Sequence, residues 1–365
     1  MANNSCLQPA YAAVNHICHI FARPAFYEMS DSCNLKCEGC YFFDPGTLHA
    51  QKLDSSEFDE KWNALLAQEK LRGVTMPYFL GAEPALEQKR LLVAKRYFRR
   101  GNLGTNGTIR LDPEIPFRIS ISAWAADEKS DSWLRGASAL RKALRLYQGD
   151  KRAILLYTVN PTNIDQVSIM ARIARDHGLP LTFNLWSPTE SILSRLSSFN
   201  GNDNEFFRIS TPENSLLFDD YDLQRTRDTL DQVIYDFPDT VIYSQSYNHW
   251  STRKGRLYTL NPETNIAEDC GSRIIGNFRY YGMNLQTQPV KCCTAAVDCE
   301  NCRLYSGGWS SHFSPAPKQI ESLAGFVDWL ETVLTIGKIF LLQETDPEAF
   351  VSGSNRPKMA METMN

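Results

Sequence analysis

The stretch FYEMSDSCNLKCEGC, residues 26–40, is the part of the sequence that most strongly indicates the fold and the chemistry. Residues 26–30 are typical of a strand, and Cys33, Cys37 and Cys40 follow on the loop after it in a C-x3-C-x2-C spacing. Three thiolates this close can each bind one iron of a [4Fe–4S] cluster and leave the fourth iron without a protein ligand. The alternative is a zinc site that lacks one ligand, but zinc motifs favour cysteine pairs that together supply four ligands.

Strand-like and helix-like runs alternate downstream of these cysteines. Asp54 and Glu57 can form a capping box at the start of one helix, and further helices are predicted over 86–98, 137–147 and 164–177. Strands separated by such helices imply right-handed βαβ units and a parallel sheet. The expected fold is α/β, a partial (β/α)6 TIM-type barrel, and its predicted strands are 26–30, 75–80, 117–123, 153–159 and 181–186, with a sixth near 240–244.

Two of these strands alternate apolar and polar side chains. In a barrel one set can face the helices and the other a wet lumen, whereas a flat doubly wound sheet prefers unbroken apolar strands. The alternative is that the polar positions are exposed at a sheet edge. The residues expected to line a polar cavity are Arg118, Ser120, Ser122, Thr182, Asn184 and Trp186.

The motifs after the cysteines resemble those of the radical S-adenosylmethionine (SAM) superfamily over residues 23–190. Residues 81–84, Gly-Ala-Glu-Pro, resemble the family's Gly-Gly-Glu-Pro turn, with Ala82 in place of the second glycine. Residues 105–107, Thr-Asn-Gly, and 119–121, Ile-Ser-Ile, resemble the ends of the third and fourth strands. Ser122 stands where many relatives carry an acid, and Gly39 where many carry an aromatic residue. The glycine at this position resembles the subgroup that contains the hopanoid adenosyltransferase.

This resemblance implies an enzyme that reductively cleaves SAM to a 5′-deoxyadenosyl radical and abstracts a hydrogen atom from its substrate. The cofactors implied are a SAM-binding [4Fe–4S] cluster and SAM itself, with a flavodoxin or ferredoxin as electron donor. The residues that the resemblance places at the cofactors are Gly39, Tyr41, Gly81, Ala82, Glu83, Pro84, Asn106, Ser120, Ser122, Arg135, Asn163 and Trp186.

A second cysteine group lies between residues 270 and 302. It resembles the auxiliary-cluster domains called SPASM and twitch, and it has too few cysteines for the two clusters of a full SPASM domain. Neighbouring strand residues point to opposite faces, so only one of Cys292 and Cys293 is expected to be a ligand. Cys293 is then a buried bystander or a hydrogen donor to the substrate. The ligands expected for one auxiliary [4Fe–4S] cluster are Cys270, Cys292, Cys299 and Cys302. A structural zinc ribbon is the alternative.

These signals divide the chain into four parts. We expect an N-terminal extension over 1–22, the barrel over 23–247, an auxiliary-cluster domain over 248–310, and C-terminal helices and a tail over 311–365. The 365 residues carry a net charge of −4, which disfavours general nucleic-acid binding. No run of 18 apolar residues occurs, so no membrane span is expected. Without an export signal, the chain is expected in the cytoplasm.

The substrate is the least specified part of the function. A polar lumen suits a sugar-like or natural-product small molecule that undergoes oxidation, epimerisation or dehydration. One alternative is a maturase that modifies a peptide or protein, although the roughly 25 residues before the first strand are too few for a leader-binding domain. The alternative from another class is a non-enzymatic, zinc-held binding module.

Overall fold

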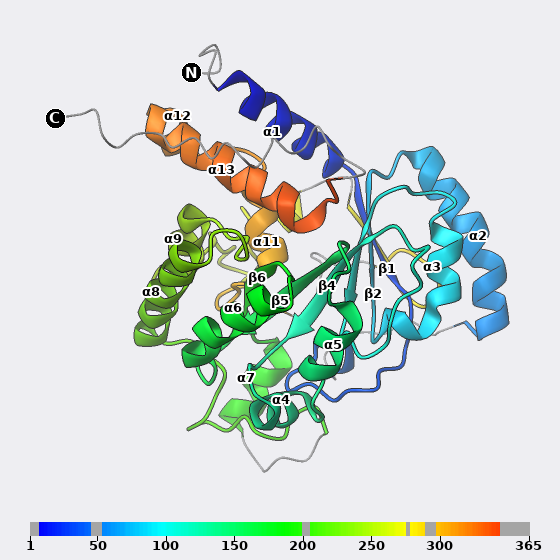
Figure 1. Ribbon diagram of the computed structural model, residues 1–365, viewed down its shortest axis with the longest axis horizontal. Helices are drawn as coiled ribbons and strands as arrows, with labels where there is room; N and C mark the ends of the chain where they lie inside the picture. The colour runs from blue at the N-terminus through cyan, green and yellow to red at the C-terminus, as the bar shows by residue number, and fades with distance from the viewer. Residues whose placement is uncertain (1–6, 45–52, 199–204, 275–277, 289–296, 344–365) are drawn as a thin grey trace.

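The computed structural model describes residues 7–44, 53–198, 205–274, 278–288 and 297–343. Its centre is one parallel sheet in the order β6-β5-β4-β3-β2-β1-β7 (Figure 1). Because β1 to β6 follow one another in parallel, their carboxyl ends lie along the same edge of the sheet. The sheet does not close, so the fold is the α/β partial barrel that the sequence predicts. The strands are β1 (Pro24–Glu28), β2 (Met76–Leu80), β3 (Asn102–Thr105), β4 (Arg118–Ala123), β5 (Ala153–Val159), β6 (Leu181–Leu185) and β7 (Arg279–Tyr281).

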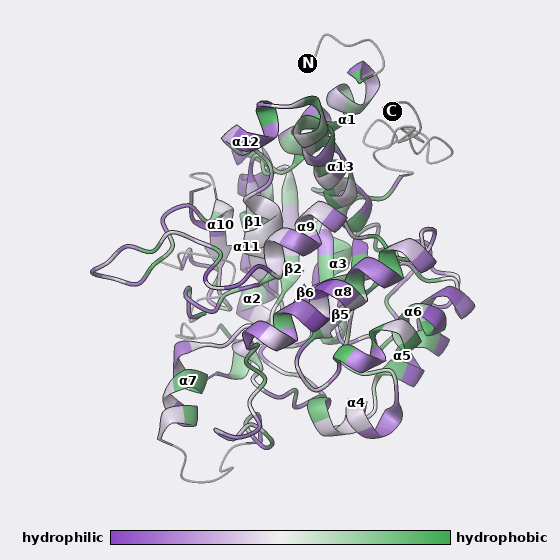
Figure 2. Cartoon of the chain, turned by 90° about the vertical axis from the view of Figure 1, so that its left-hand side faces the viewer, coloured by the Kyte–Doolittle hydropathy of each residue, from purple (hydrophilic) through white to green (hydrophobic). Residues whose placement is uncertain are grey.

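Helices cover the sheet on its outer side. The predicted cap of α2 is present, since the side chain of Asp54 accepts a hydrogen bond from the backbone N–H of Glu57. Figure 2 shows α8 with a largely hydrophilic face turned outward, as expected of a helix that packs on one side only. The helices are α1 (Gln8–Ile20), α2 (Ser55–Arg72), α3 (Gln88–Ala94), α4 (Glu128–Arg135), α5 (Leu140–Tyr147), α6 (Val167–Asp176), α7 (Glu190–Ser197), α8 (Asp220–Asp236), α9 (Gln245–Ser251), α10 (Gly271–Ile274), α11 (Tyr305–Ser310), α12 (Pro317–Ile320) and α13 (Leu323–Phe340).

The amino end of the barrel is closed by the pair α1 and α13, which lie side by side (Figure 1). Arg118, the first residue of β4, donates from Nε to the carbonyl of Ile339 at 2.9 Å and from Nη2 to that of Lys338 at 3.3 Å. Burial lowers the pKa of this guanidinium to about 10. Its carbonyl partners at the end of α13 hold the helix against the sheet. None of the helices in the described part of the chain has the length and apolar character that crossing a bilayer requires.

Five of the six polar strand positions are buried, which contradicts the edge-exposure alternative for them, and Ser122 is half-buried. Arg118, Ser120, Thr182, Asn184 and Trp186 are each at most 7% exposed. Several of them bond to protein instead of facing an open lumen. Asn102 donates from Nδ2 to Ser120 Oγ at 3.1 Å, and Asn184 Oδ1 accepts the backbone N–H of Tyr305 at 3.0 Å.

The strands of the sheet differ from the sequence-based expectation in two respects. The sixth parallel strand of the barrel is β3, while residues 240–244 contribute a single bridge, between Leu181 and Val241. In addition, β7 pairs with β1 in the register Phe26 to Tyr280, so part of the stretch assigned to an auxiliary domain extends the barrel sheet. The chain turns back on itself after β7, with an antiparallel bridge between Tyr281 and Thr287.

Candidate active site

The cysteine loop runs from the carboxyl end of β1 across the top of the sheet. Cys33, Cys37 and Cys40 are half-buried thiols. The loop is fastened to the end of α4, because the N–H of Lys36 donates to the carbonyl of Arg135 at 3.0 Å and that of Glu38 to Leu134 at 2.8 Å. In parallel barrels, loops at this end form the active site.

Asn106 connects the loop to the end of β3. Its Nδ2 lies 3.6 Å from Cys33 Sγ and donates to Asn34 Oδ1 at 2.8 Å. Asn34 in turn donates to the hydroxyl of Thr108 at 2.8 Å. The Thr-Asn-Gly turn predicted from the sequence therefore lies directly against the first cysteine.

Glu83 fastens the 81–84 turn to the 105–107 turn. Its carboxylate is 1% exposed and accepts hydrogen bonds from Thr105 Oγ1 at 2.6 Å, the N–H of Asn106 at 2.8 Å and the N–H of Ala85 at 2.9 Å. Burial raises the pKa of Glu83, while these three donors act in the opposite direction. The carboxylate of Glu83 thus accepts hydrogen bonds from both turns and positions them relative to each other.

The glycine that opens the 81–84 turn is required by close backbone packing. Gly81 has φ +127°, and a Cβ there would lie 2.9 Å from the carbonyl oxygen of Ser30. The next residue, Ala82, donates its N–H to the same carbonyl at 3.0 Å. Only glycine permits this approach, which places the backbone of the turn beside the start of the cysteine loop.

Arg135 supplies a buried positive charge beneath the loop. It is 1% exposed, and its Nη1 donates to the carbonyl of Ser122 at 2.8 Å and lies 3.8 Å from Asp131 Oδ1. Burial disfavours the charged guanidinium, but Cys37 and Asp131 outweigh it and the pKa of Arg135 is raised. Its Nε has no partner among the described residues. A buried cation at this place favours the binding of an anionic group above it.

The segment after residue 204 forms a backbone cradle for the loop. Glu38 is fully buried, and its carboxylate accepts the N–H groups of Arg208 at 2.8 Å, Ser210 at 3.1 Å and Ile209 at 3.3 Å. The N–H of Gly39 donates back to the carbonyl of Phe206 at 2.8 Å. This reciprocal contact fixes the short stretch between Cys37 and Cys40.

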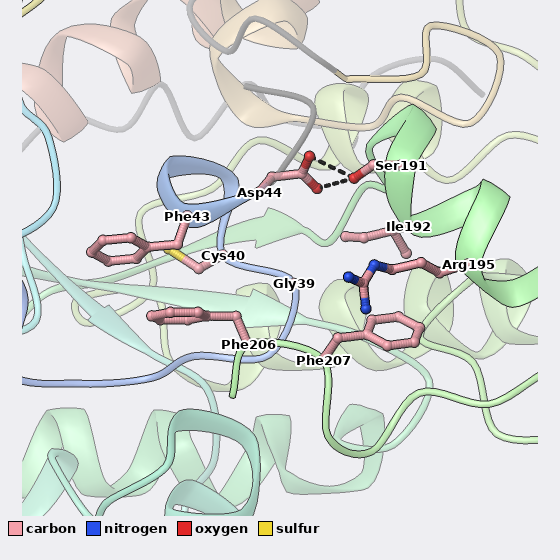
Figure 3. A pocket seen from close by; sticks show the side chains of 9 residues that line it. All are labelled: Gly39, Cys40, Phe43, Asp44, Ser191, Ile192, Arg195, Phe206 and Phe207. Atoms are coloured by element: carbon pink, nitrogen blue, oxygen red, sulfur yellow. Dashed lines mark hydrogen bonds between the residues drawn. The ribbon is translucent and has the colours of Figure 1, made fainter. Parts of the chain in front are cut away.

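A small pocket beside Cys40 is walled by aromatic side chains (Figure 3). Phe43 and Phe206 stack with ring centroids 4.5 Å apart. Asp44, 6% exposed, accepts hydrogen bonds from the hydroxyls of Thr189 and Ser191, which tie the loop to the start of α7. The aromatic side chains cover one side of the last cysteine.

Tyr41 joins the two groups of cysteines. Its hydroxyl donates to the carbonyl of Ser187 at 3.0 Å. Its ring packs against a buried apolar cluster that contains Cys270, Cys299 and Cys302. These three thiols line one cavity. Cys292 and Cys293 lie outside the described residues, so the choice between them stays a prediction.

The remaining residues predicted to bind the cofactors lie at different distances from the cysteine loop. Trp186 lies at the loop, since a Cβ on Gly39 would be 3.2 Å from its indole ring. Asn163 is 1% exposed; its Oδ1 accepts the N–H of Asn160, and its Nδ2 donates to the carbonyls of Thr158 and of Trp124, just after β4. These bonds join the turn after β5 to the end of β4. Ser120 is bonded to Asn102 in mid-sheet, below the loop.

The residues present fit an iron–sulfur cluster. Within the described ranges, no three His, Cys, Asp or Glu side chains converge closely enough to hold a single metal ion. A cubane cluster does not require such convergence, because each thiolate binds a different iron. Burial raises the pKa of Cys40 to about 12 and also raises the pKa of Cys33. Forming thiolates here needs compensating cations, which iron supplies.

Three residues of the site had no signal in the sequence. These residues are charged side chains that belong to no recognisable motif: Glu38, Asp44 and Arg273. Arg273 donates from Nη2 to Cys299 Sγ at 3.0 Å. For Glu38 and Asp44 the partners lie 145 to 172 positions away in the chain. Only the folded structure brings them together.

No protein-family model and no curated protein matches the chain. Among solved structures, the chain is similar to SuiB of Streptococcus suis, at 14% identity and a TM-score of 0.49 over 78% of this chain and 64% of SuiB. It thus spans less than two thirds of that protein. It is also similar to native anSMEcpe with bound AdoMet, at 13% identity and a TM-score of 0.48 over 90% of this chain and 96% of that one. HydG, a maturase of the [FeFe]-hydrogenase, is similar at 10% identity and a TM-score of 0.36 over 64% of this chain and 56% of HydG.

Proposed function

We propose that the chain is a radical SAM enzyme. The observation that carries this proposal is the joining of three motifs at one end of the parallel sheet. The thiol of Cys33 contacts Asn106 of the 105–107 turn, and Glu83 of the 81–84 turn accepts the N–H of that same Asn106. Three motifs that lie far apart in sequence thus form one hydrogen-bonded unit beside three thiols.

Cys33, Cys37 and Cys40 would hold three irons of a [4Fe–4S] cluster. When bound, the cluster and SAM together supply a 5′-deoxyadenosyl radical that abstracts a hydrogen atom from the substrate. The backbone of the 81–84 turn would receive the methionyl end of SAM, with Glu83 holding the turn in shape. Arg135, with an unpartnered Nε beside Cys37, would offset the negative charge that the loop acquires.

The chain's other contribution is a fixed site. Glu38 and the cradle of residues 206–210 set the path of the loop, and Phe43, Phe206 and Trp186 pack around it. Such positioning is what proteins add to cofactor chemistry.

A second [4Fe–4S] cluster is proposed at Cys270, Cys299, Cys302 and one of Cys292 and Cys293. The support is that the three described thiols line one buried cavity, against which Tyr41 of the first loop packs. The electron donor would be a flavodoxin or ferredoxin. A reducing cytoplasm, where thiols stay available for iron, is the compartment proposed.

The substrate comes from one of two classes. The sequence indicates a polar small molecule, but three of the six polar strand residues that supported it, Arg118, Ser120 and Asn184, hydrogen-bond to protein. Thr182 Oγ1 and Trp186 Nε1 have no hydrogen-bond partner among the described residues. The similar solved structures include SuiB bound to precursor peptide SuiA and anSMEcpe with bound AdoMet and Kp18Cys peptide. A peptide is therefore the first class to test, with sugar-like molecules second.

The test of the proposed function uses anaerobically reconstituted protein. We expect about eight irons per chain from two [4Fe–4S] clusters. Replacing Cys33, Cys37 and Cys40 together by alanine should remove about half of the iron and abolish 5′-deoxyadenosine formation, measured by mass spectrometry. The matched control is Cys18→Ala, a half-buried thiol that contacts only the carbonyl of Phe313 among the bonds described. Undiminished 5′-deoxyadenosine from the triple variant, or zinc in place of iron, contradicts the proposal.

A further inference from the structure

The guanidinium of Arg273 reaches into the cavity of the second cysteine group. Its Nη2 donates to Cys299 Sγ at 3.0 Å, and Arg273 lines the same cavity as Cys270, Cys299 and Cys302. Its Nη1 is buried and has no hydrogen-bond partner among the described residues. Of the two terminal nitrogens of Arg273, Nη2 therefore donates to a thiol, whereas Nη1 has no acceptor among the described residues.

The backbone holds Arg273 close to the cysteines. Its N–H donates to the carbonyl of Cys270 at 2.9 Å, within the turn that becomes α10. That turn packs tightly on α11, because a Cβ on Gly271 would overlap the backbone of Ser310. On α11, a Cβ on Gly307 would lie 3.1 Å from Cys270 Sγ. The two glycines therefore allow Cys270 and Arg273 to enter the cavity together.

The positive charge of Arg273 is not neutralised by a carboxylate. Within the described residues it makes no ion pair. Arg273 is half-buried and its Nη1 is shielded from solvent, so holding this charge there without an anionic partner has a cost. The thiols beside it become anionic when they bind iron, so a cluster in this cavity would supply the missing counter-charge.

A fixed cation at a cluster has a defined effect on redox chemistry. Taking up one electron makes the cluster more negative by one charge. A neighbouring guanidinium stabilises that reduced form more than the oxidised form, and hydrogen bonds to the sulfurs act in the same direction. The reduction potential of the cluster is therefore raised.

We propose that Arg273 raises the reduction potential of the auxiliary cluster. This inference rests on the proposed function, since it needs a cluster at Cys270, Cys299 and Cys302. It goes beyond that function by naming the residue that tunes this potential. Arg273 is a positioning and tuning residue; it is not a ligand to iron.

The experiment is a potentiometric titration of the reconstituted holoenzyme with dithionite, followed by electron paramagnetic resonance. The auxiliary signal is assigned as the one that remains when Cys33, Cys37 and Cys40 are replaced by alanine. Arg273→Gln keeps a hydrogen-bond donor and removes the charge, whereas Arg273→Lys keeps the charge. The matched control is Arg279→Gln on β7, where the guanidinium contacts Glu69 and Tyr281 instead of a thiol.

We expect Arg273→Gln to keep its iron and to shift the oxidised-to-reduced ratio at fixed potential at least tenfold toward the oxidised form, a fall of 59 mV for one electron. Arg273→Lys should restore most of the difference, and Arg279→Gln should match the unmodified chain. An unchanged potential in Arg273→Gln overturns the inference. So does equal loss of auxiliary iron from both Arg273 variants, which would make the role structural.

The two proposals can fail separately. If SAM is cleaved normally and no second cluster forms, the inference about Arg273 fails and the proposed function stands. If SAM is not cleaved but the auxiliary potential falls in Arg273→Gln, the inference stands and the proposed function fails.

Discussion

The buried carboxylate of Glu38 accepts a hydrogen bond from the backbone N–H of Arg208 at 2.8 Å, although 170 positions separate the two residues. The contact lies between two of the three cysteines of the loop. Two further N–H groups, of Ile209 and Ser210, point at the same carboxylate. The loop therefore takes its shape from a segment that the barrel strands do not include.

Glu38→Gln tests this cradle. The amide has one acceptor oxygen and would turn its NH2 group toward backbone donors, leaving at least one buried N–H without an acceptor. We expect the free energy of unfolding to fall by about 1–3 kcal/mol, measured by urea denaturation of the protein without iron. The control is Glu205→Gln, whose exposed side chain pairs with Lys36 and should cost little. Equal stability of the two variants would remove the cradle's role.

Glu83→Ala tests the junction between the two turns. The change leaves Thr105 Oγ1 and the N–H groups of Ala85 and Asn106 without their acceptor. At about 1–3 kcal/mol for unsatisfied buried groups, SAM affinity should fall tenfold or more, measured by equilibrium binding to the reconstituted enzyme. Glu87→Ala, one turn further on and paired only loosely with Arg90 at 3.7 Å, is the control. Normal SAM affinity in Glu83→Ala would show that the turn is not part of the SAM site.

Single alanine replacements at Cys292 and Cys293 decide the fourth auxiliary ligand. Adjacent strand residues face opposite ways, so one variant should lose auxiliary iron and the other should keep it. We expect the loss in Cys292→Ala, by iron analysis after reconstitution. If Cys293→Ala keeps its iron, consumes SAM and releases no product, Cys293 is a hydrogen donor and the reaction is an epimerisation. Equal iron loss from both variants would contradict the division of roles.

His312 makes stability depend on pH. Burial lowers the pKa of His312 below 6.5, and its Nδ1 lies 2.7 Å from the carbonyl oxygen of Gly308. Near pH 6.5 the imidazole of His312 therefore binds a proton in the unfolded chain but remains neutral in the folded chain. Stability is therefore complete above pH 6.5 and falls below it, by up to about 1.4 kcal/mol per pH unit from this one group.

The measurement is urea unfolding of His312→Asn and the unmodified chain between pH 8 and pH 5. The variant should be less stable at pH 8, because the ring also packs on Tyr247 and Trp250, but its stability should fall less steeply below pH 6.5. Parallel pH profiles for the two proteins would exclude His312 as the source.

How far the sequence determined the fold can be argued element by element. The strand expected over 153–159 is β5 at the same bounds, because every residue in it is buried and a continuous apolar run is unambiguous there. Helix α4 was not predicted, since its eight residues include Glu128, Asp131 and Arg135 and show no long apolar face. Strand β7 has only three residues, and its strand character comes from pairing with β1.

For the site, local motifs indicated the ligands but not the contacts that hold them. The spacing of Cys33, Cys37 and Cys40 and the 81–84 and 105–107 turns lie within short windows, so the sequence displays them directly. The hydrogen bonds of Glu83 to Thr105 and Asn106 could not be read from the sequence, because these partners lie at the end of the next strand.

The strand order also determines when each part of the sheet can be completed during translation. Strand β1, next to the edge strand β7, gains its second neighbour only when Arg279 to Tyr281 have left the ribosome. Arg118 can bond to the carbonyl of Ile339 only 221 residues after its own addition. Until then one side of β1 presents unpaired backbone groups that can join another chain. The cysteine loop, which begins directly after β1, is thus attached to an unfinished scaffold for most of translation. Slow expression at low temperature, with iron supplied after the chain is released, should therefore give more soluble and more fully loaded protein than rapid expression with early iron.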